Sequence, residues 1–351
     1  MVSFILLLSI VTNTIFNFLE YHDNKLFQIG IAKSYLESME RGNENFNSSF
    51  RVISQVELQD HKLPISAIST ICVDNGKFII LDTQGKQVLV FKQNGILLSS
   101  IGKIGSGPGE YKNPYHMDIN KFGQVLILDT GNMRVSKFNQ NGTFLSSNNV
   151  KLGVRIKADN NKGFYLYNST ESAFKDKGVI SHYNEDGQNV NTFCKPFFKI
   201  GMVGVNFAKD NDGNLYIAHS TVYSIKKYSA EGHFINEFGV VPKNFKGLDI
   251  PINKLTNLNE LDETTPVLRI VVTPNNLVLI EYSVNKKSWL DIYDTSGKLF
   301  KAGIKLPQGM RLGSTDKDNQ IYFIQNPADD FTDDIEIKFK IILCKLKDIN
   351  K

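Results

Sequence analysis

The sequence predicts an all-β fold, a six-bladed β-propeller built from four-stranded antiparallel blades. The first observation is an internal repeat: residues 76–100 and 123–147 align without a gap and are identical at 13 of 25 positions. Repeats of this length are typical of stacked or circular arrays of one supersecondary unit. The second observation is that short apolar runs alternate with Asn-Gly and Asp-Gly turns. Such runs form hairpins, because glycine adopts a positive φ at low steric cost.

One repeat contains the parts of a blade. In the second copy we expect strands at Val125–Leu128, at Arg134–Phe138 and from Thr143, with a turn at Asn139–Gly142 before the last of them. The pattern recurs along the chain and gives six units, which start near residues 70, 116, 155, 206, 269 and 311. Six four-stranded sheets around an axis close a ring that leaves no long exposed sheet edge.

The last unit lacks an outer strand, and the N-terminal side of the chain offers one. The sixth unit ends at a strand near residues 335–345, whereas Phe50–Leu58 reads FRVISQVEL and precedes the first unit. The economical interpretation is that this run pairs with the last blade and locks the ring. The propeller is therefore predicted to cover residues 50–347, with residues 348–351 as a tail.

Residues 102–145 resemble an NHL repeat. They contain a Gly-rich loop, a proline and a strand, followed by the pattern D-x-x-N-x-R-V-x-x-F-x-x-x-G, here Asp129, Asn132, Arg134, Val135, Phe138 and Gly142. The loop Gly107–Tyr111 is also similar to a loop of the six-bladed propeller proteins of Bacteroidota-type bacteria, many of them exported. The resemblance implies the fold and export. It implies no single activity, because such propellers include partner-binding modules, nucleic-acid binders, lyases and hydrolases.

The N-terminal residues have features of an export or anchor segment. Residues 1–19 carry no charged side chain, and Phe4–Val11 is an apolar run long enough for the hydrophobic part of a signal peptide. We expect export to the periplasm or cell envelope, with residues 20–49 as a stalk and linker. The alternative is an uncleaved anchor that attaches the protein to a membrane, although a segment of this length is marginal for spanning about 30 Å.

Composition narrows the classes of partner. The formal net charge is +4, and the lysines and arginines are scattered, which disfavours nucleic acid as a partner. Three cysteines, Cys72, Cys194 and Cys344, lie far apart, so neither a zinc ribbon nor a disulfide framework is expected. Cys72 and Cys344 fall in predicted strands and are expected to be small buried side chains. A bridge between these two is the alternative.

The familiar catalytic motifs are absent from the sequence. It contains no Gly-x-Ser-x-Gly, no His-Glu-x-x-His and no phosphate loop, and no two histidines have metal-ligand spacing. We therefore predict no catalytic residue, no metal and no cofactor. Gly105–Gly109 precedes a strand rather than a helix and is expected to be a tight connection between blades. Asp82 and Asp129 end strands and are expected to cap the turns that follow.

One set of polar residues forms the candidate site. The first position of each innermost strand is polar in all six units and is followed by an apolar residue. These polar positions are Thr70, His116, Arg155, Asn206, Arg269 and Arg311. In a propeller they ring one mouth of the axial channel, where guanidinium groups bind carboxylate or phosphate in a bidentate manner. The alternative is that each arginine pairs with a nearby acid such as Asp118 or Asp159.

The sequence favours a non-enzymatic binding module of the cell envelope. Its channel mouth would contact an anionic small molecule or a protein partner. The alternative is a propeller lyase or hydrolase acting at the same mouth, with His116 or His219 as the base and an arginine holding a carboxylate. An enzyme would need a metal or an acid–base pair within reach of each other, and the sequence shows neither.

Overall fold

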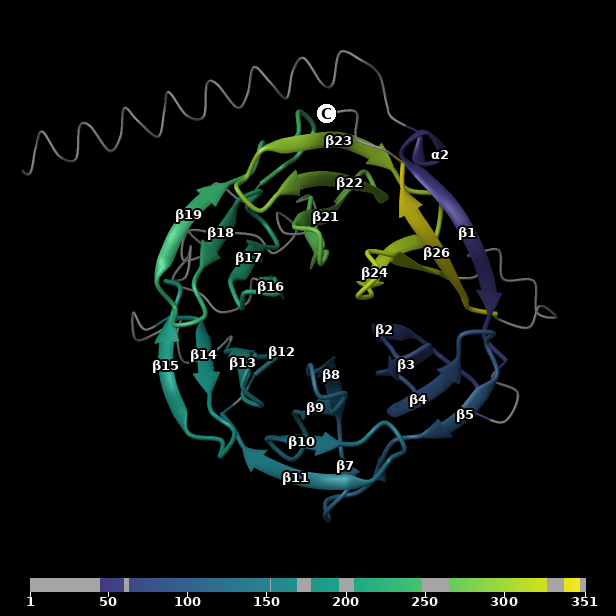
Figure 1. The fold of residues 1–351 in the computed structure, drawn as a ribbon, viewed down its shortest axis with the longest axis vertical. Helices are drawn as coiled ribbons and strands as arrows, with labels where there is room; N and C mark the ends of the chain where they lie inside the picture. Colours follow the sequence, from purple (N-terminus) through teal and green to yellow (C-terminus); the bar gives the residue numbers. More distant parts are fainter. Residues whose placement is uncertain are drawn as a thin grey trace, which may run out of the picture.

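The protein forms a ring of six four-stranded antiparallel sheets around a central axis, as predicted (Figure 1). The computed structural model describes residues 45–59, 63–151, 153–168, 178–195, 205–247, 265–326 and 338–347. The predicted signal or anchor segment and the first part of the predicted stalk lie outside these described residues. Within them, no helix has both the length and the apolar character needed to cross a membrane.

Five blades are runs of four consecutive strands, each numbered from the axis outward. Blade 1 contains β2 (Ile68–Asp74), β3 (Lys77–Asp82), β4 (Gln87–Lys92) and β5 (Leu97–Ser100). Blade 2 contains β8 (Pro114–Ile119), β9 (Val125–Asp129), β10 (Arg134–Phe138) and β11 (Phe144–Asn149). Blade 3 contains β12 (Arg155–Ala158), β13 (Phe164–Tyr167), β14 (Ile180–Tyr183) and β15 (Asn189–Phe193).

The second half of the ring repeats this order. Blade 4 contains β16 (Val205–Lys209), β17 (Leu215–His219), β18 (Ile225–Tyr228) and β19 (Phe234–Phe238). Blade 5 contains β20 (Val267–Val272), β21 (Leu277–Val284), β22 (Lys287–Asp294) and β23 (Leu299–Lys305). Blade 6 contains β24 (Met310–Thr315), β25 (Ile321–Gln325), β26 (Lys340–Leu346) and, as its outermost strand, β1 (Phe50–Glu57).

The strand β1 closes the ring in the way that the sequence predicts. It pairs antiparallel with β26, from Phe50 opposite Leu346 to Glu57 opposite Lys340. Blade 6 is therefore built from both ends of the propeller, and Figure 1 shows β1 lying along the outside of β26. Pairing of the first and last strands ties distant parts of the chain together and supplies the strand that the sixth unit lacks.

Part of the expected linker is packed against blade 6. Residues Phe46–Ser49 form the one-turn helix α2, whose N-cap is Asn45. The Phe46 side chain is buried; its ring stacks on Phe50 at a centroid distance of 5.0 Å and meets Phe323 edge-on at 5.3 Å. The ordered packing of the propeller thus includes residues that composition alone assigns to a linker.

The core lies between neighbouring blades. The residue after each mouth position on an innermost strand is buried and apolar in all six blades: Ile71, Met117, Ile156, Phe207, Ile270 and Leu312. Side chains of alternate strand residues point to opposite faces of a sheet, so this residue packs between blades while its neighbours face elsewhere. Burial of these apolar faces is the main contribution to the stability of the ring.

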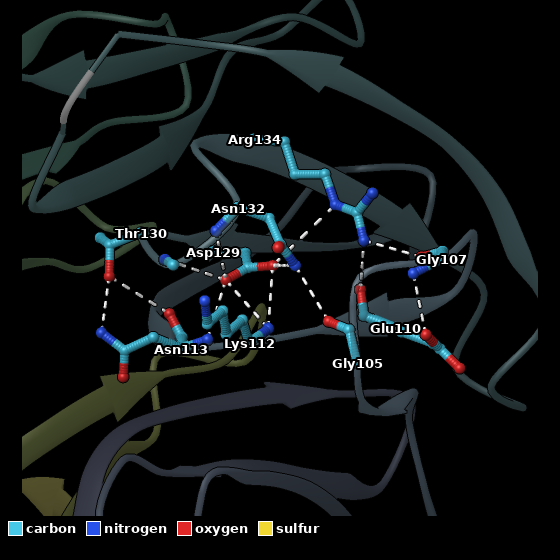
Figure 2. A network of polar contacts seen from close by, with 10 residues as sticks. Gly105, Gly107, Glu110, Lys112, Asn113, Asp129, Thr130, Asn132 and Arg134 are labelled. Carbon is cyan, nitrogen blue, oxygen red and sulfur yellow. Dashed lines mark hydrogen bonds and ion pairs between the residues drawn. The ribbon is translucent and has the colours of Figure 1, made fainter.

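The strand β9 ends in a carboxylate that caps the connection between blades 1 and 2 (Figure 2). Asp129 accepts hydrogen bonds from the backbone N–H groups of Lys112 and Asn113 at 2.9–3.2 Å. It also accepts the side-chain amide of Asn132 at 2.6 Å. The Asp82 carboxylate plays the same part in blade 1. The expectation that these carboxylates cap turns is confirmed, because their oxygens are occupied by backbone N–H groups.

The Gly-rich loop is held by the arginine of the NHL-like pattern. Arg134 Nη2 donates to the carbonyl oxygens of Gly107 at 2.7 Å and of Glu110 at 2.8 Å (Figure 2). The Glu110 carboxylate in turn accepts the N–H of Gly107 at 2.8 Å. The loop lies between the short paired strands β6 (Lys103–Ile104) and β7 (Glu110–Tyr111). It is a structural connection between blades, as expected.

The three cysteines are free and buried. Cys72 lies on β2 and Cys344 on β26, and no bridge joins them. Burial raises the pKa of the Cys72 thiol to about 12, so this group is protonated at neutral pH. The cysteines therefore act as small apolar side chains, and the alternative of a bridge between the first and last blades is not what the structure shows.

Candidate functional site

The innermost strands surround a cavity of about 630 Å³ on the propeller axis. Five of the six predicted mouth residues contribute to its wall: Thr70, His116, Arg155, Asn206 and Arg269. The sixth, Arg311, is exposed and is not part of the wall. It occupies the equivalent position on β24, where it pairs with Ile324 and precedes the buried Leu312.

All six residues lie at the same end of the channel. Each blade repeats the same strand order from the axis outward, so the innermost strands run in one direction and begin at one mouth. We call this end, defined by Thr70, His116, Arg155, Asn206, Arg269 and Arg311, the arginine mouth. The positive charges influence one another across it: Arg155 and Arg311 both lower the pKa of Arg269, after the larger effect of burial.

Two of the three arginines have no carboxylate partner among the described residues. Arg155 Nη1 donates to the carbonyl oxygen of its neighbour Val154 at 2.9 Å, which uses one of its five N–H groups. Arg311 is exposed, and no ion pair joins it to a described acid. A guanidinium group without a resident counter-charge is available to an external anion.

The acids that the sequence suggests as partners are engaged elsewhere. Asp118 pairs with Lys157 Nζ at 2.9 Å and accepts the N–H of Ala158 at 2.8 Å. Asp159 contacts Nε2 of His182 at 2.9 Å and accepts a backbone N–H. Asp118 and Asp159 therefore do not neutralise a mouth arginine, although one mouth arginine, Arg269, does pair with another acid, Glu281. Arg155 lies two residues before Lys157, but only the lysine reaches the carboxylate of Asp118.

Arg269 differs from the other two because a buried carboxylate lies beside it. Its Nη1 atom is 3.9 Å from Oε2 of Glu281, and Glu281 is 0% exposed. The same carboxylate oxygen accepts the N–H of Leu312 on the neighbouring blade at 2.8 Å. Burial raises the pKa of Glu281, and the charge of Arg269 acts in the opposite direction.

Sequence reasoning missed Glu281. It follows the apolar run of β21, and its cross-strand partner on β20 is Arg269. The corresponding partners of Thr70, His116, Asn206 and Arg311 on the second strands are all apolar: Leu81, Leu128, Ala218 and Ile324. An alignment of the second strands, and not only of the innermost strands, would have shown this single acid.

His116 is a neutral imidazole at the mouth. Burial lowers its pKa well below the ordinary value, and the charges of Arg155, Lys157 and Arg269 lower the pKa further. Its Nδ1 atom accepts the backbone N–H of Ile156 at 3.4 Å, which leaves the proton on Nε2. The ring can therefore donate one hydrogen bond, and it is a weak base.

The other proposed base lies away from the cavity. His219 ends β17 at the position that Asp129 has in β9, and it is buried outside the wall. Burial lowers its pKa to about 3. His219 therefore does not join the residues that the sequence places at the mouth.

The remaining mouth residues supply neutral polar groups. Asn206 Nδ2 donates to the carbonyl oxygen of Val267 at 3.1 Å and links blades 4 and 5. Thr70 belongs to the wall contributed by blade 1. Below the mouth, blades 2 and 3 contribute the Asp118–Lys157 pair. Within the described ranges, no three His, Cys, Asp or Glu side chains are grouped so that they could hold a metal ion.

Solved structures of other proteins share the fold. A protein of Bacteroides fragilis NCTC 9343 named "Putative exported protein" has 15% sequence identity and a TM-score of 0.66, covering 88% of this chain and 98% of its own. A member of the duf4221 family from Bacteroides vulgatus ATCC 8482 has 11% identity and a TM-score of 0.63, covering 85% and 98%. Virginiamycin B lyase from Staphylococcus aureus has 13% identity and a TM-score of 0.52, covering 85% and 100%. At these identities the likeness shows the fold alone.

Sequence comparison identifies the family. A comparison with curated proteins gave no match. A protein-family model described as "6-bladed beta-propeller" matches residues 32–305, which is most of the chain. The chain therefore belongs to this family of six-bladed β-propellers.

Proposed function

We propose that this protein is a non-enzymatic binding module of the cell envelope whose arginine mouth binds an anionic small molecule. The observation that carries the proposal is that Arg155 and Arg311 lack a carboxylate partner among the described residues. Both lie at the mouth of a cavity of about 630 Å³. The cavity volume falls in the range of small-molecule sites, roughly 300–1,000 Å³.

Binding of an anion would relieve the repulsion among like charges at this mouth. A carboxylate or phosphate between the guanidinium groups gains charge-assisted hydrogen bonds, each of which contributes roughly 1.5–3 kcal/mol. Nε2 of His116 adds a neutral donor.

The same geometry gives less support to acid–base catalysis. A general base needs a pKa near the working pH, whereas burial and three nearby cations lower the pKa of His116. The location in the envelope is supported by the apolar run Phe4–Val11 and by the likeness in fold to the B. fragilis protein named as exported. Binding without chemistry is therefore the function that the mouth supports best.

Calorimetric titration with succinate and inorganic phosphate tests the proposal, with succinamide as the uncharged analogue of succinate. We expect the anions to bind and succinamide not to bind. The double variant Arg155→Met/Arg311→Met should weaken binding at least about tenfold, since each lost charge-assisted bond exceeds the roughly 1.4 kcal/mol that a factor of ten requires.

The matched control is Lys121→Met/Lys317→Met, which removes the same charge from the wall of the same cavity, but at its other end. Binding that weakens equally in both double variants would show a general attraction to positive charge and would contradict the proposed site. A wild-type protein that binds neither anion, nor any other carboxylate or phosphate in a wider panel, would also contradict it.

A further inference from the structure

We propose that Glu281 is a resident anion of the arginine mouth, which competes with the external anion for Arg269 and so limits how tightly the mouth binds. The inference rests on the proposed function and names the residue that regulates it. Glu281 is the cross-strand partner of Arg269, and the carboxylate is wholly buried beside the guanidinium group. It is therefore a carboxylate that any anion entering the mouth meets beside Arg269.

Arg269 lies within ion-pair distance of Glu281 but makes no hydrogen bond to it. A good pair between arginine and carboxylate has N–O distances of about 2.7–2.9 Å, whereas Arg269 Nη1 lies 3.9 Å from Glu281 Oε2. This Nη1 atom has no hydrogen-bond partner among the described residues. The Arg269 side chain is 23% exposed and belongs to the cavity wall. Nη1 itself is buried, so an anion in the cavity reaches Arg269 through the exposed part of its side chain, whose charge Glu281 only partly neutralises.

Burial of the Glu281 carboxylate lowers the stability of the fold, and packing at this position does not require a carboxylate. Four other blades have apolar residues at the equivalent position, namely Leu81, Leu128, Ala218 and Ile324. A buried carboxylate loses hydration that an apolar side chain does not need. A neutral acceptor could take the hydrogen bond from the N–H of Leu312 equally well. The charge itself, rather than the shape, is the feature that requires a functional explanation.

The competition has a defined dependence on pH. The groups that face Glu281 are Arg269 on β20, Ser288 on β22, and the N–H of Leu312 and the charge of Arg311 on β24. An anion at the mouth adds negative charge and attracts Arg269, so the pKa of Glu281, which burial already raises above 4.5, rises further on binding. Binding then takes up a proton. Affinity increases as the pH falls through the window between these two raised pKa values.

Succinate titrations of wild-type protein and of Glu281→Gln over a range of pH test the inference. Gln keeps the size of the side chain and an acceptor for the N–H of Leu312. We expect Glu281→Gln to bind succinate roughly tenfold more tightly, because an opposing charge a few ångströms from the ligand is removed. The affinity of wild-type protein for succinate should rise as the pH falls. The binding enthalpy measured in buffers of different ionisation enthalpy should show that wild-type protein takes up a proton on binding and that the variant does not.

Two further variants keep the test decisive. Glu281→Leu reproduces the side chain of the equivalent position in blades 1 and 2, and it should also bind more tightly if Glu281→Gln folds poorly. Asp291→Asn removes the other buried carboxylate of blade 5, whose neighbours are tyrosines and a backbone N–H rather than an arginine. This control should leave the affinity for succinate and its proton uptake unchanged.

The outcomes separate this inference from the proposed function. Equal affinity in wild-type protein and Glu281→Gln, without proton uptake, overturns the inference and leaves the anion site standing. Succinate binding that is weak in wild-type protein and stronger in Glu281→Gln and Glu281→Leu supports the inference, because the resident carboxylate then opposes the ligand. Absence of binding in every variant overturns both.

Discussion

Arg269 and Glu281 are cross-strand neighbours on β20 and β21, and their Nη1 and Oε2 atoms lie 3.9 Å apart. The three mouth arginines are therefore not equivalent. Arg269 stands beside a resident carboxylate, whereas Arg155 and Arg311 have none among the described residues. The acid opposite Arg269 thus divides a ring of similar positions into one arginine with a resident carboxylate partner and two without.

The first prediction concerns stability. Mutual repulsion alone would predict that replacing Arg269 and Arg311 by methionine leaves the melting temperature equal or higher. Because Glu281 is buried beside Arg269, we expect Arg269→Met to lower the free energy of unfolding by about 1–3 kcal/mol. Arg311→Met should leave it unchanged or slightly raised. Urea denaturation of the single variants distinguishes these results, and equal destabilisation by both would contradict the distinction between the two arginines.

The closure of the ring gives a second prediction. Deletion of residues 1–44 should leave the melting temperature unchanged, because it keeps the N-cap Asn45 and the buried side chain of Phe46. Deletion of residues 1–58 removes β1 and exposes the outer edge of β26, so it should destabilise the whole propeller. Thermal unfolding followed by circular dichroism provides the comparison. Cooperative melting of the longer deletion at the wild-type temperature would show that the pairing with β26 does not hold the ring.

The cap in blade 2 gives a third prediction. Asp129→Ala should cost about 2–4 kcal/mol of stability, because several backbone N–H groups lose their buried acceptor at once. Asp129→Asn retains one acceptor oxygen and should cost less. Chemical denaturation of the two variants checks the order. A metal-binding role for Asp129 would instead appear as loss of stability on treatment with a chelator.

A buried carboxylate in blade 5 gives a fourth prediction, on pH. Asp291 accepts hydrogen bonds from the hydroxyl groups of Tyr223 and Tyr282 and from the N–H of Gly303, and burial raises its pKa from 3.8 to about 7. The folded state then holds a proton that the unfolded state loses. The contribution of this bound proton to the free energy of unfolding is full below about pH 4 and is lost as the pH rises to about 7.

The Asp291→Asn variant isolates this contribution. The free energy of unfolding, measured from about pH 4 to about pH 8, should fall less steeply in the variant than in wild-type protein. The difference between the two curves should be confined to the window below pH 7. Parallel curves would show that Asp291 is ionised in the folded protein, in which case the two tyrosine hydroxyls and Gly303 stabilise the charged form.

The fifth prediction concerns location. Fractionation of the native organism should place the protein outside the cytoplasm, because the run Phe4–Val11 has the length of a signal-peptide hydrophobic region. Mass spectrometry of the isolated protein would show whether the N-terminal segment is removed. A cytoplasmic protein with an intact Met1 would contradict export and would require another role for this segment.

The blades were predictable because their signals are local and repeated. Turn chemistry and strand periodicity recur in each unit. The innermost strand of blade 3 starts at the predicted residue, Arg155, and those of the other five blades start one or two residues before the predicted position. The closing strand Phe50–Glu57 was predictable from a missing partner in the sixth unit. Helix α2 was not, because Phe46 is buried by contacts with Phe323, which lies far away in the sequence. The polar residues around Phe46 have the composition of a linker, and composition does not indicate a contact between residues so far apart in the sequence.

The candidate site was predictable in position but not in its pairing. The repeat aligns the six mouth residues, and five of them line one cavity. The acid that pairs with each basic side chain depends on which side chain reaches across the boundary between two blades. Asp118 pairs with Lys157 rather than Arg155, although both cations lie on β12. Glu281 meets Arg269 through a register that includes an irregularity between Val267 and Arg269. Such details follow from three-dimensional geometry.

Anion binding at the arginine mouth is tested most directly by a crystal structure of the protein grown with selenate, a tetrahedral dianion that anomalous diffraction locates without ambiguity. We expect an anomalous peak at the arginine mouth, within hydrogen-bonding distance of Arg155 or Arg311, and no such peak in the Arg155→Met/Arg311→Met variant. Selenate found only at surface lysines, with the arginine mouth empty in the wild-type protein, would contradict the central claim that this mouth binds anions.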